Sequence, residues 1–171
     1  MHLVILGDTH IPGRARELAP ELWTALSDAD AVLHTGDWTE VGLLDQLAPR
    51  CNRLVAVFGN NDDAELRARL PEVARVELAG VRFVVVHETG PASGREKRCK
   101  ARFPDADVVV FGHSHVPWDS TASGDLRLLN PGSPTDRRRQ PACTFMEAEV
   151  ADGLLVGVQL RQVSPERRPR H

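Results

Sequence analysis

Cysteine is scarce in this chain of 171 residues, which has only Cys51, Cys99 and Cys143. The three lie far apart and none has the CxxC spacing of a zinc knuckle or a redox motif. This usage argues against a disulfide framework and predicts reduced thiols in a cytoplasmic protein.

Long apolar runs are also missing, since none approaches the roughly 18 residues of a membrane span. The first ten residues, MHLVILGDTH, have no basic start and reach Asp8 early, so we expect no signal peptide. The net charge is −3 and the sequence pI is about 6.2, which is unfavourable for general nucleic-acid or membrane-surface binding. We therefore expect no membrane partner and no general nucleic-acid partner.

The remaining composition is that of an ordinary globular protein, with 42% hydrophobic and 26% charged residues. A chain of this length can bury a proper core as one unit. We predict a single domain over 1–163 and a flexible basic tail, SPERRPRH, over 164–171.

Short apolar runs alternate with helical stretches in the first half of the chain, a pattern typical of a parallel or mixed sheet buried on both faces. Strands are predicted at 2–6, 31–34 and 53–58, and helices at 16–29, 39–48 (capped by Thr39) and 62–70. The second half is richer in strands, predicted as a hairpin over 74–87 that turns at Ala79-Gly80, a polar helix at 94–103, and strands at 107–111, 125–130, 143–150 and 154–163. The sum predicts a layered α/β domain with two sheets, the second largely antiparallel.

Potential metal ligands follow five of these strands. They are Asp8 and His10 in GDTH, Asp37 in GDW, Asn60 in GNND, His87, and His113 and His115 in GHSH. Taken singly, an Asp or Asn after a strand is usually a turn former or a helix cap, and a lone His is usually packed. Their joint occurrence favours a shared site, because ligands bind at the carboxyl ends of strands in α/β sheets. A glycine before Asp8, Asp37, Asn60 and His113 would allow the backbone to approach that site closely.

These ordered motifs resemble those of the calcineurin-like metallophosphoesterases, and more narrowly the small prokaryotic phosphodiesterases of that family. The resemblance includes the later NPGS (130–133) and covers residue 3 to about residue 160. It implies a metallophosphoesterase-type β-sandwich of two mixed sheets flanked by helices.

The resemblance also implies two metal sites. Asp8, His10 and His115 would hold the first ion, Asn60, His87 and His113 the second, and Asp37 would bridge both. Asp37, Asn60 and His113 would also act at the reacting phosphate. The donors are carboxylate, amide and imidazole, which suit two divalent transition-metal ions, with Mn²⁺ expected first and Fe, Zn, Co or Ni as alternatives.

The function implied is hydrolysis of a small phosphodiester or nucleotide-like substrate by a metal-activated water or hydroxide. Two other readings stay open: a phosphomonoesterase or nuclease, and a non-catalytic scaffold, because eukaryotic retromer contains a partner-binding subunit of this fold. Relatives of this size are often dimers or tetramers, so self-association is also expected by analogy.

Two positions depart from the family pattern. Asn61 stands where many larger members carry a His near the leaving group, and an amide cannot be a general acid near neutral pH. We therefore expect a preference for diesters with good leaving groups. Glu88 replaces the usual Gly after the lone His and is predicted to face solvent rather than a ligand imidazole.

Several other residues have both a functional and a structural reading. His34 is either a support for a metal ligand or a packed strand histidine. Trp38 and Trp118 form either a stacking wall for a base or ordinary packing. Asn130 and Ser133 either contact the site or form a turn, and Arg137–Arg139 either bind phosphate or lie in a solvated loop.

Overall fold

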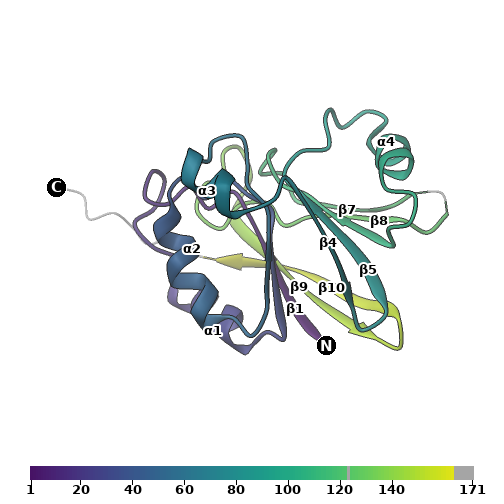
Figure 1. Cartoon of the computed structure of the whole chain (residues 1–171), viewed down its shortest axis with the longest axis horizontal. Helices are drawn as coiled ribbons and strands as arrows, with labels where there is room; N and C mark the ends of the chain where they lie inside the picture. Colours follow the sequence, from purple (N-terminus) through teal and green to yellow (C-terminus); the bar gives the residue numbers. More distant parts are fainter. Residues whose placement is uncertain (123, 164–171) are drawn as a thin grey trace.

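The computed structural model describes residues 1–122 and 124–163, which form a sandwich of two five-stranded sheets (Figure 1). Helices lie outside both sheets, so the predicted β-sandwich of two mixed sheets flanked by helices is confirmed. The predicted tail at 164–171 lies outside the described residues.

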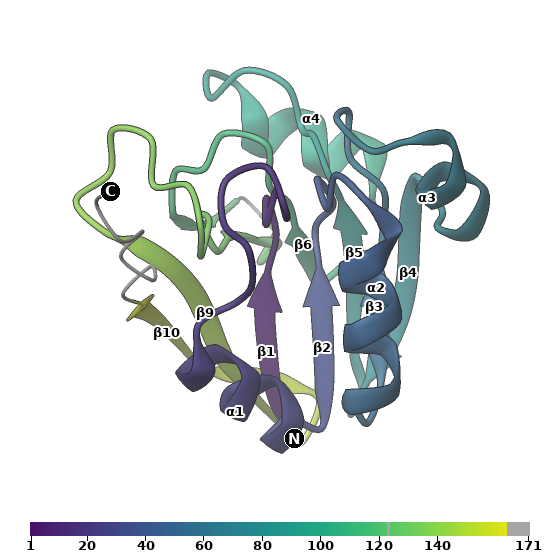
Figure 2. The same cartoon turned by 90° about the vertical axis from the view of Figure 1, so that its left-hand side faces the viewer.

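The first sheet combines a parallel half with an antiparallel half. Its strands, in spatial order, are β10 (Leu154–Val163), β9 (Cys143–Ala151), β1 (His2–Leu6), β2 (Ala31–His34) and β3 (Leu54–Ala56). The pairs β1–β2 and β2–β3 are parallel, whereas β9 is antiparallel to both of its neighbours. Helices α1 (Pro20–Asp28) and α2 (Val41–Leu47) lie against this sheet in Figure 2; the 3₁₀ turn η1 (Ala48–Arg50) and α3 (Ala64–Arg69) complete this half.

The second sheet has parallel strands at its centre and antiparallel strands at its edges. Its order is β4 (Val73–Leu78), β5 (Val81–Val86), β6 (Val108–Val110), β8 (Arg127–Asn130) and β7 (Trp118–Thr121), and helix α4 (Arg95–Arg102) packs on its outer face. The expectation that this sheet would be largely antiparallel is wrong, because β5, β6 and β8 are parallel. The β9–β10 hairpin joins the first sheet instead, where Met146 and Ala148 extend the core between the sheets.

The apolar runs of the strands fill two layers at once. In β1, Ile5 faces the second sheet and packs in one cluster with Leu33, Phe83 and Val110. Its neighbour Leu6 points the other way, into the cluster under α1 and α2. A strand buried on both faces has no polar face to show, which is why these segments read as continuous apolar runs.

Local signals explain most element boundaries and also the differences. Helix α1 begins later than predicted, with Pro20 at its first position, where a fixed φ suits a helix start. Thr39 is not the cap of α2, a prediction that was wrong; the residue at the cap position is Glu40. Thr39 has a φ of 89° and donates its backbone N–H to Asp62 Oδ1 at 2.8 Å, so this loop is shaped by a tertiary contact. Strand β7 was not predicted.

Within the described ranges, no helix has the length and apolar character needed to cross a membrane.

The core between the two sheets should be sensitive to loss of volume. Replacing Leu33 by Ala removes a fully buried side chain and is expected to lower the free energy of unfolding by about 2–5 kcal/mol, measured by urea denaturation. Leu154→Ala is the control, since that side chain is 65% exposed and should change stability by less than about 0.5 kcal/mol. Equal effects of the two substitutions would contradict the assigned core.

Candidate metal centre

The seven predicted site residues all follow strand ends that meet at one edge of the sandwich. Figure 2 shows β1 and β2 ending at the same edge of the first sheet, and the loops after β3, β5 and β6 bring the other residues to them. The structure therefore brings together all of the predicted residues, Asp8, His10, Asp37, Asn60, His87, His113 and His115, in two adjoining groups.

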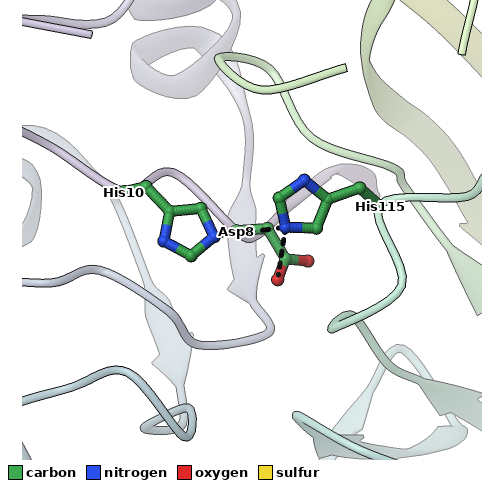
Figure 3. A group of neighbouring side chains, drawn as sticks. All are labelled: Asp8, His10 and His115. Carbon is green, nitrogen blue, oxygen red and sulfur yellow. Dashed lines mark hydrogen bonds and ion pairs between the residues drawn. The ribbon is translucent and has the colours of Figure 1, made fainter. Parts of the chain in front are cut away.

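The first donor group consists of Asp8, His10 and His115 (Figure 3). The Nε2 atoms of His10 and His115 lie 3.1 Å apart, and His115 Nε2 lies 3.5 Å from Asp8 Oδ1. The two imidazole rings are stacked at 29° with their centroids 5.1 Å apart, so both direct a nitrogen toward the same point.

The second donor group consists of Asn60, His87 and His113. Asn60 Oδ1 lies 2.9 Å from His87 Nε2 and 2.9 Å from His113 Nδ1. These two nitrogens are themselves 3.3 Å apart. Three donors from three different loops thus face one another closely.

Asp37 lies between the two groups. Its Oδ2 is 3.6 Å from His10 Nε2 and its Oδ1 is 3.4 Å from His87 Nε2. One carboxylate oxygen therefore faces each group, which is the arrangement required of a bridging ligand. Asn61 donates its backbone N–H to Oδ1 at 2.9 Å and its side-chain amide to Oδ2 at 2.7 Å, which fixes the plane of this carboxylate.

Hydrogen bonds on the far side of the rings orient the histidines. His87 Nδ1 donates to the Thr35 carbonyl at 2.8 Å, and His115 Nδ1 donates to the Asp136 carbonyl at 2.7 Å. A neutral imidazole that donates through Nδ1 keeps its lone pair on Nε2, which in both residues is the atom facing the site. The rings are therefore prepared to accept a cation.

The backbone at the site is strained. Positive φ values occur at Asp8 (52°), His10 (45°), Asp37 (58°), His113 (70°) and His115 (58°). Residues with side chains seldom adopt this region, and such strain gathers at functional sites. Five of the seven predicted site residues share it.

Two of the motif glycines are required by close packing against the carboxylates. A Cβ at Gly112 would lie 2.6 Å from Asp8 Oδ2, and a Cβ at Gly59 would overlap the Asp37 side chain. The predicted role of glycine in close backbone approach is thus seen at these positions.

Burial dominates the electrostatics of the first donor group. It raises the pKa of Asp8 well above its ordinary value, and the neighbouring charge of Asp37 raises it further. Burial lowers the pKa of His10, and lowers that of His115 to about 4. The histidines are therefore neutral near neutral pH, while the two carboxylates repel each other.

This donor set fits divalent ions. Two ligands of one transition-metal ion at the usual bond lengths stand about 3–3.4 Å apart, close to the separations within both groups. A cation would also relieve the repulsion between Asp8 and Asp37. The site contains oxygen and imidazole donors and no thiolate, in keeping with metals of the Mn-to-Zn series.

Asp62 is the supporting residue that the sequence reasoning missed. Its carboxylate is buried and accepts backbone N–H groups from Asp37 at 3.1 Å, Gly59 at 2.7 Å and Thr39 at 2.8 Å. It therefore ties the loop after β2 to the loop after β3. The sequence placed Asp62 only as the first residue of a helix over 62–70, whereas α3 begins at Ala64 and Asp63 is its cap.

The NPGS segment supports the site through its ligand loops. Ser133 Oγ donates to the Asp8 carbonyl at 2.8 Å, and Asn130 Nδ2 donates to the Gly112 carbonyl at 2.9 Å. Both bonds go to backbone and neither to a donor atom of the site. The segment therefore joins the GDTH loop to the GHSH loop, in addition to forming a turn.

The two tryptophans and Glu88 have contacts that bear on their alternative roles. Trp38 is fully buried, donates to the Val57 carbonyl and stacks on His34 with centroids 3.4 Å apart, so it is not a wall for a base. Trp118 donates to Ser120 Oγ and lies beside Arg95. Glu88 is exposed, as predicted, although its Oε1 lies 3.9 Å from His113 Nε2.

Fold and site together define a protein of the metallophosphoesterase class. Residues 1–153 match the family described as "Calcineurin-like phosphoesterase superfamily domain". A protein of Methanocaldococcus jannaschii named "Probable metallophosphoesterase MJ0623" is 34% identical over 156 residues, which are 90% of this chain and 78% of the relative. A "Probable metallophosphoesterase" of Methanothermobacter thermautotrophicus is 32% identical over 137 residues, 79% of this chain and 78% of the relative.

Solved structures share the fold. Vps29 from Chaetomium thermophilum has a TM-score of 0.77 at 22% identity, covering 95% of this chain and 97% of that one. A zinc complex of Vps29 from Entamoeba histolytica has a TM-score of 0.75 at 24% identity, covering 95% and 98%. The chain described here belongs to the calcineurin-like phosphoesterase superfamily, whose members use divalent metals.

Asp62 provides a test of how the site is supported. Asp62→Ala leaves three backbone donors without their acceptor and should lower the free energy of unfolding by about 3 kcal/mol. It should also weaken Mn²⁺ binding about 10–100-fold, since it releases the backbone of Asp37. Calorimetric titration and urea denaturation measure the two effects.

Asp63→Ala is the matched control, because it removes the adjacent carboxylate and only the α3 cap. It should cost about 1 kcal/mol and leave Mn²⁺ affinity unchanged. The proposed support is wrong if both variants bind Mn²⁺ equally well.

Proposed function

We propose that this protein is a two-metal phosphodiesterase acting on small, nucleotide-like phosphodiesters. The observation that carries the proposal is the Asp37 carboxylate, which presents one oxygen to each of two complete donor groups. In this assignment Asp8, His10 and His115 hold the first ion, Asn60, His87 and His113 hold the second, and Asp37 binds both. Mn²⁺ is the metal we propose first, and the mixed oxygen and imidazole donors are also compatible with Fe, Zn, Co or Ni.

The burial pattern supports an approach of substrate from one side. Asp8, Asp37, His87 and His115 are buried at the base of the site, whereas Asn60 is exposed. His113 is also open, with 43% of its side chain exposed. Asn60 and His113 therefore form the rim that an incoming phosphate would meet, which agrees with their proposed action at the reacting phosphate.

The net charge of the site with two ions bound would favour hydrolysis of a phosphodiester. Two divalent ions, when bound, would supply Lewis acidity toward the phosphoryl oxygens and lower the pKa of water in the site. Asp8 and Asp37 cancel only two of the four positive charges, so an excess of positive charge remains for an anionic phosphodiester. The transition state carries more negative charge than the diester, so the site favours the transition state.

Asn61 sets a limit on protonation of the leaving group. Its side-chain amide donates to Asp37 Oδ2 and its backbone N–H to Oδ1, so it acts as a brace for that carboxylate. An amide has no titrating proton near neutral pH. The enzyme is therefore expected to depend on leaving groups that depart without protonation by a side chain.

The competing functions have less support. A scaffold that had lost its metal would be expected to lack ligands, whereas here every proposed donor position holds a suitable side chain. The two solved Vps29 structures described above share only the fold with this chain, at under 25% identity. A nuclease would be expected to carry a basic surface, and the net charge of −3 argues against one.

Metal dependence and the bridging role of Asp37 can be tested together. Chelator-treated protein should not hydrolyse bis(p-nitrophenyl) phosphate, and added Mn²⁺ should restore activity. Asp37→Asn should lower kcat/KM at least about a hundredfold, because it removes a charge shared by both sites. Release of p-nitrophenol measures the rate, and metal analysis measures the number of ions bound.

Asp63→Asn is the control for this experiment, because it makes the same chemical change at a residue that caps α3. Asn is an equally good cap, so the helix should be unaffected. Its activity should match that of the original protein. If the original protein hydrolyses no phosphodiester with any divalent ion, this proposal is wrong and a non-catalytic scaffold becomes the favoured function.

Leaving-group dependence tests the role of Asn61. Aryl diesters with acidic phenols should react at least about a hundredfold faster than alkyl diesters, because no side chain protonates the alkoxide. Across a series of aryl diesters whose phenol leaving groups differ in pKa, log kcat/KM should fall steeply as the phenol pKa rises. Equal rates for aryl and alkyl substrates would show that another group supplies the proton.

A further inference from the structure

Arg138 stands at the rim of the metal centre on a loop that the site itself holds in place. The loop is bound to both ligand loops: the Asp136 carbonyl accepts from His115 Nδ1 at 2.7 Å, and Thr135 Oγ1 donates to the Thr9 carbonyl at 2.7 Å. Ser133 Oγ accepts the backbone N–H of Asp136 at 2.9 Å. The position of Arg138 is thus coupled to the position of the site histidines.

The backbone of Arg138 is set in an unusual conformation. Its φ is 47°, and its N–H donates to Asp136 Oδ1 at 3.2 Å. From there the side chain reaches back over the GHSH loop, where Nη1 lies 3.5 Å from the His113 carbonyl oxygen. The guanidinium is therefore next to His113, one of the two rim residues.

The guanidinium is free to bind a ligand. In the described ranges 1–122 and 124–163, no carboxylate lies within ion-pair distance of Arg138. Arg14, by contrast, is already paired with Asp136 at 3.3 Å. Arg138 is exposed, so its fork of N–H donors faces solvent with a single long contact to backbone.

We propose that Arg138 binds a non-bridging oxygen of the substrate phosphate and so positions the phosphate at the metal centre. A planar guanidinium matches the paired oxygens of a phosphate, and a ligand-free fork beside the rim offers that match. This inference rests on the proposed function, because it concerns the substrate of the same site. It gives Arg138, the middle residue of the Arg137–Arg139 run, the role of a fixed positive charge outside the set of metal ligands.

The test uses Arg138→Gln, Arg138→Lys and the control Arg139→Gln in the full chain loaded with Mn²⁺. Arg139 is an adjacent exposed arginine, so its replacement makes the same change in net charge. Arg138→Gln should raise KM for bis(p-nitrophenyl) phosphate about tenfold and change kcat little, and should weaken binding of inorganic phosphate about tenfold in calorimetric titration. Arg138→Lys should have a KM and a phosphate affinity between those of the original protein and Arg138→Gln, because lysine keeps the positive charge but loses the paired N–H donors of the guanidinium.

Two further readouts separate binding of phosphate from a structural role. Mn²⁺ affinity and the melting temperature of Arg138→Gln should equal those of Arg139→Gln. The difference in phosphate affinity between the two variants should also shrink as ionic strength rises, because an exposed charge is screened by salt.

The outcomes distinguish this inference from the proposed function. If the original protein hydrolyses diesters but the Arg138 and Arg139 variants agree within about twofold in KM and phosphate affinity, the inference fails and the function stands. If phosphate binding depends on Arg138 but no diester is hydrolysed, the function fails and the phosphate site stands. Absence of any phosphate binding by the original Mn²⁺-loaded protein overturns the inference.

Discussion

The structure depends on two carboxylates held close together where water is excluded. Asp8 and Asp37 are both buried, and the pKa of Asp8 is raised by burial and then by the charge of its neighbour. Such a pair is unfavourable unless positive charge lies between or beside them. The histidines around them cannot provide it, because burial lowers the pKa of His10, His87 and His115 and keeps their rings neutral. The protein thus stores a repulsion that a pair of cations would relieve.

Keeping that arrangement requires rigid loops. Asp62 binds three backbone N–H groups across two loops, Asn61 braces the Asp37 carboxylate, and Ser133 joins the first ligand loop to a distant segment. Positive φ values at five of the site residues show that the loops hold conformations their side chains disfavour. Packing of the two sheets offsets the free-energy cost of these strained loops, because each ligand loop follows a strand of the sandwich.

Much of the site could be predicted from sequence because each donor comes directly after an apolar run. Parallel strands end at a common edge, so the order of motifs carried three-dimensional information. The support was harder to predict. Asp62 was predicted only as the first residue of a helix over 62–70, because a contact that joins two loops leaves no periodic signal in the chain. The Arg137–Arg139 run allowed both a phosphate site and a solvated loop, and the sequence did not decide between them. Strand β7 was missed for a similar reason, since Trp118–Thr121 alternates in burial over only four residues.

The sequence by itself determined the donor types, their order and the buried strands that precede them, because apolar periodicity and glycine spacing are local properties of the chain. Only the tertiary structure decided which strands pair, that β9 and β10 complete the first sheet, and that Asp37 faces both donor groups. It also decided which polar groups are free and which are paired, as at Arg138 and Arg14. The strand pairing and the geometry of the site depend on contacts between distant segments, such as His10 with His115, which lie 105 residues apart in the sequence. Such long-range contacts leave no signal at any single position of the sequence.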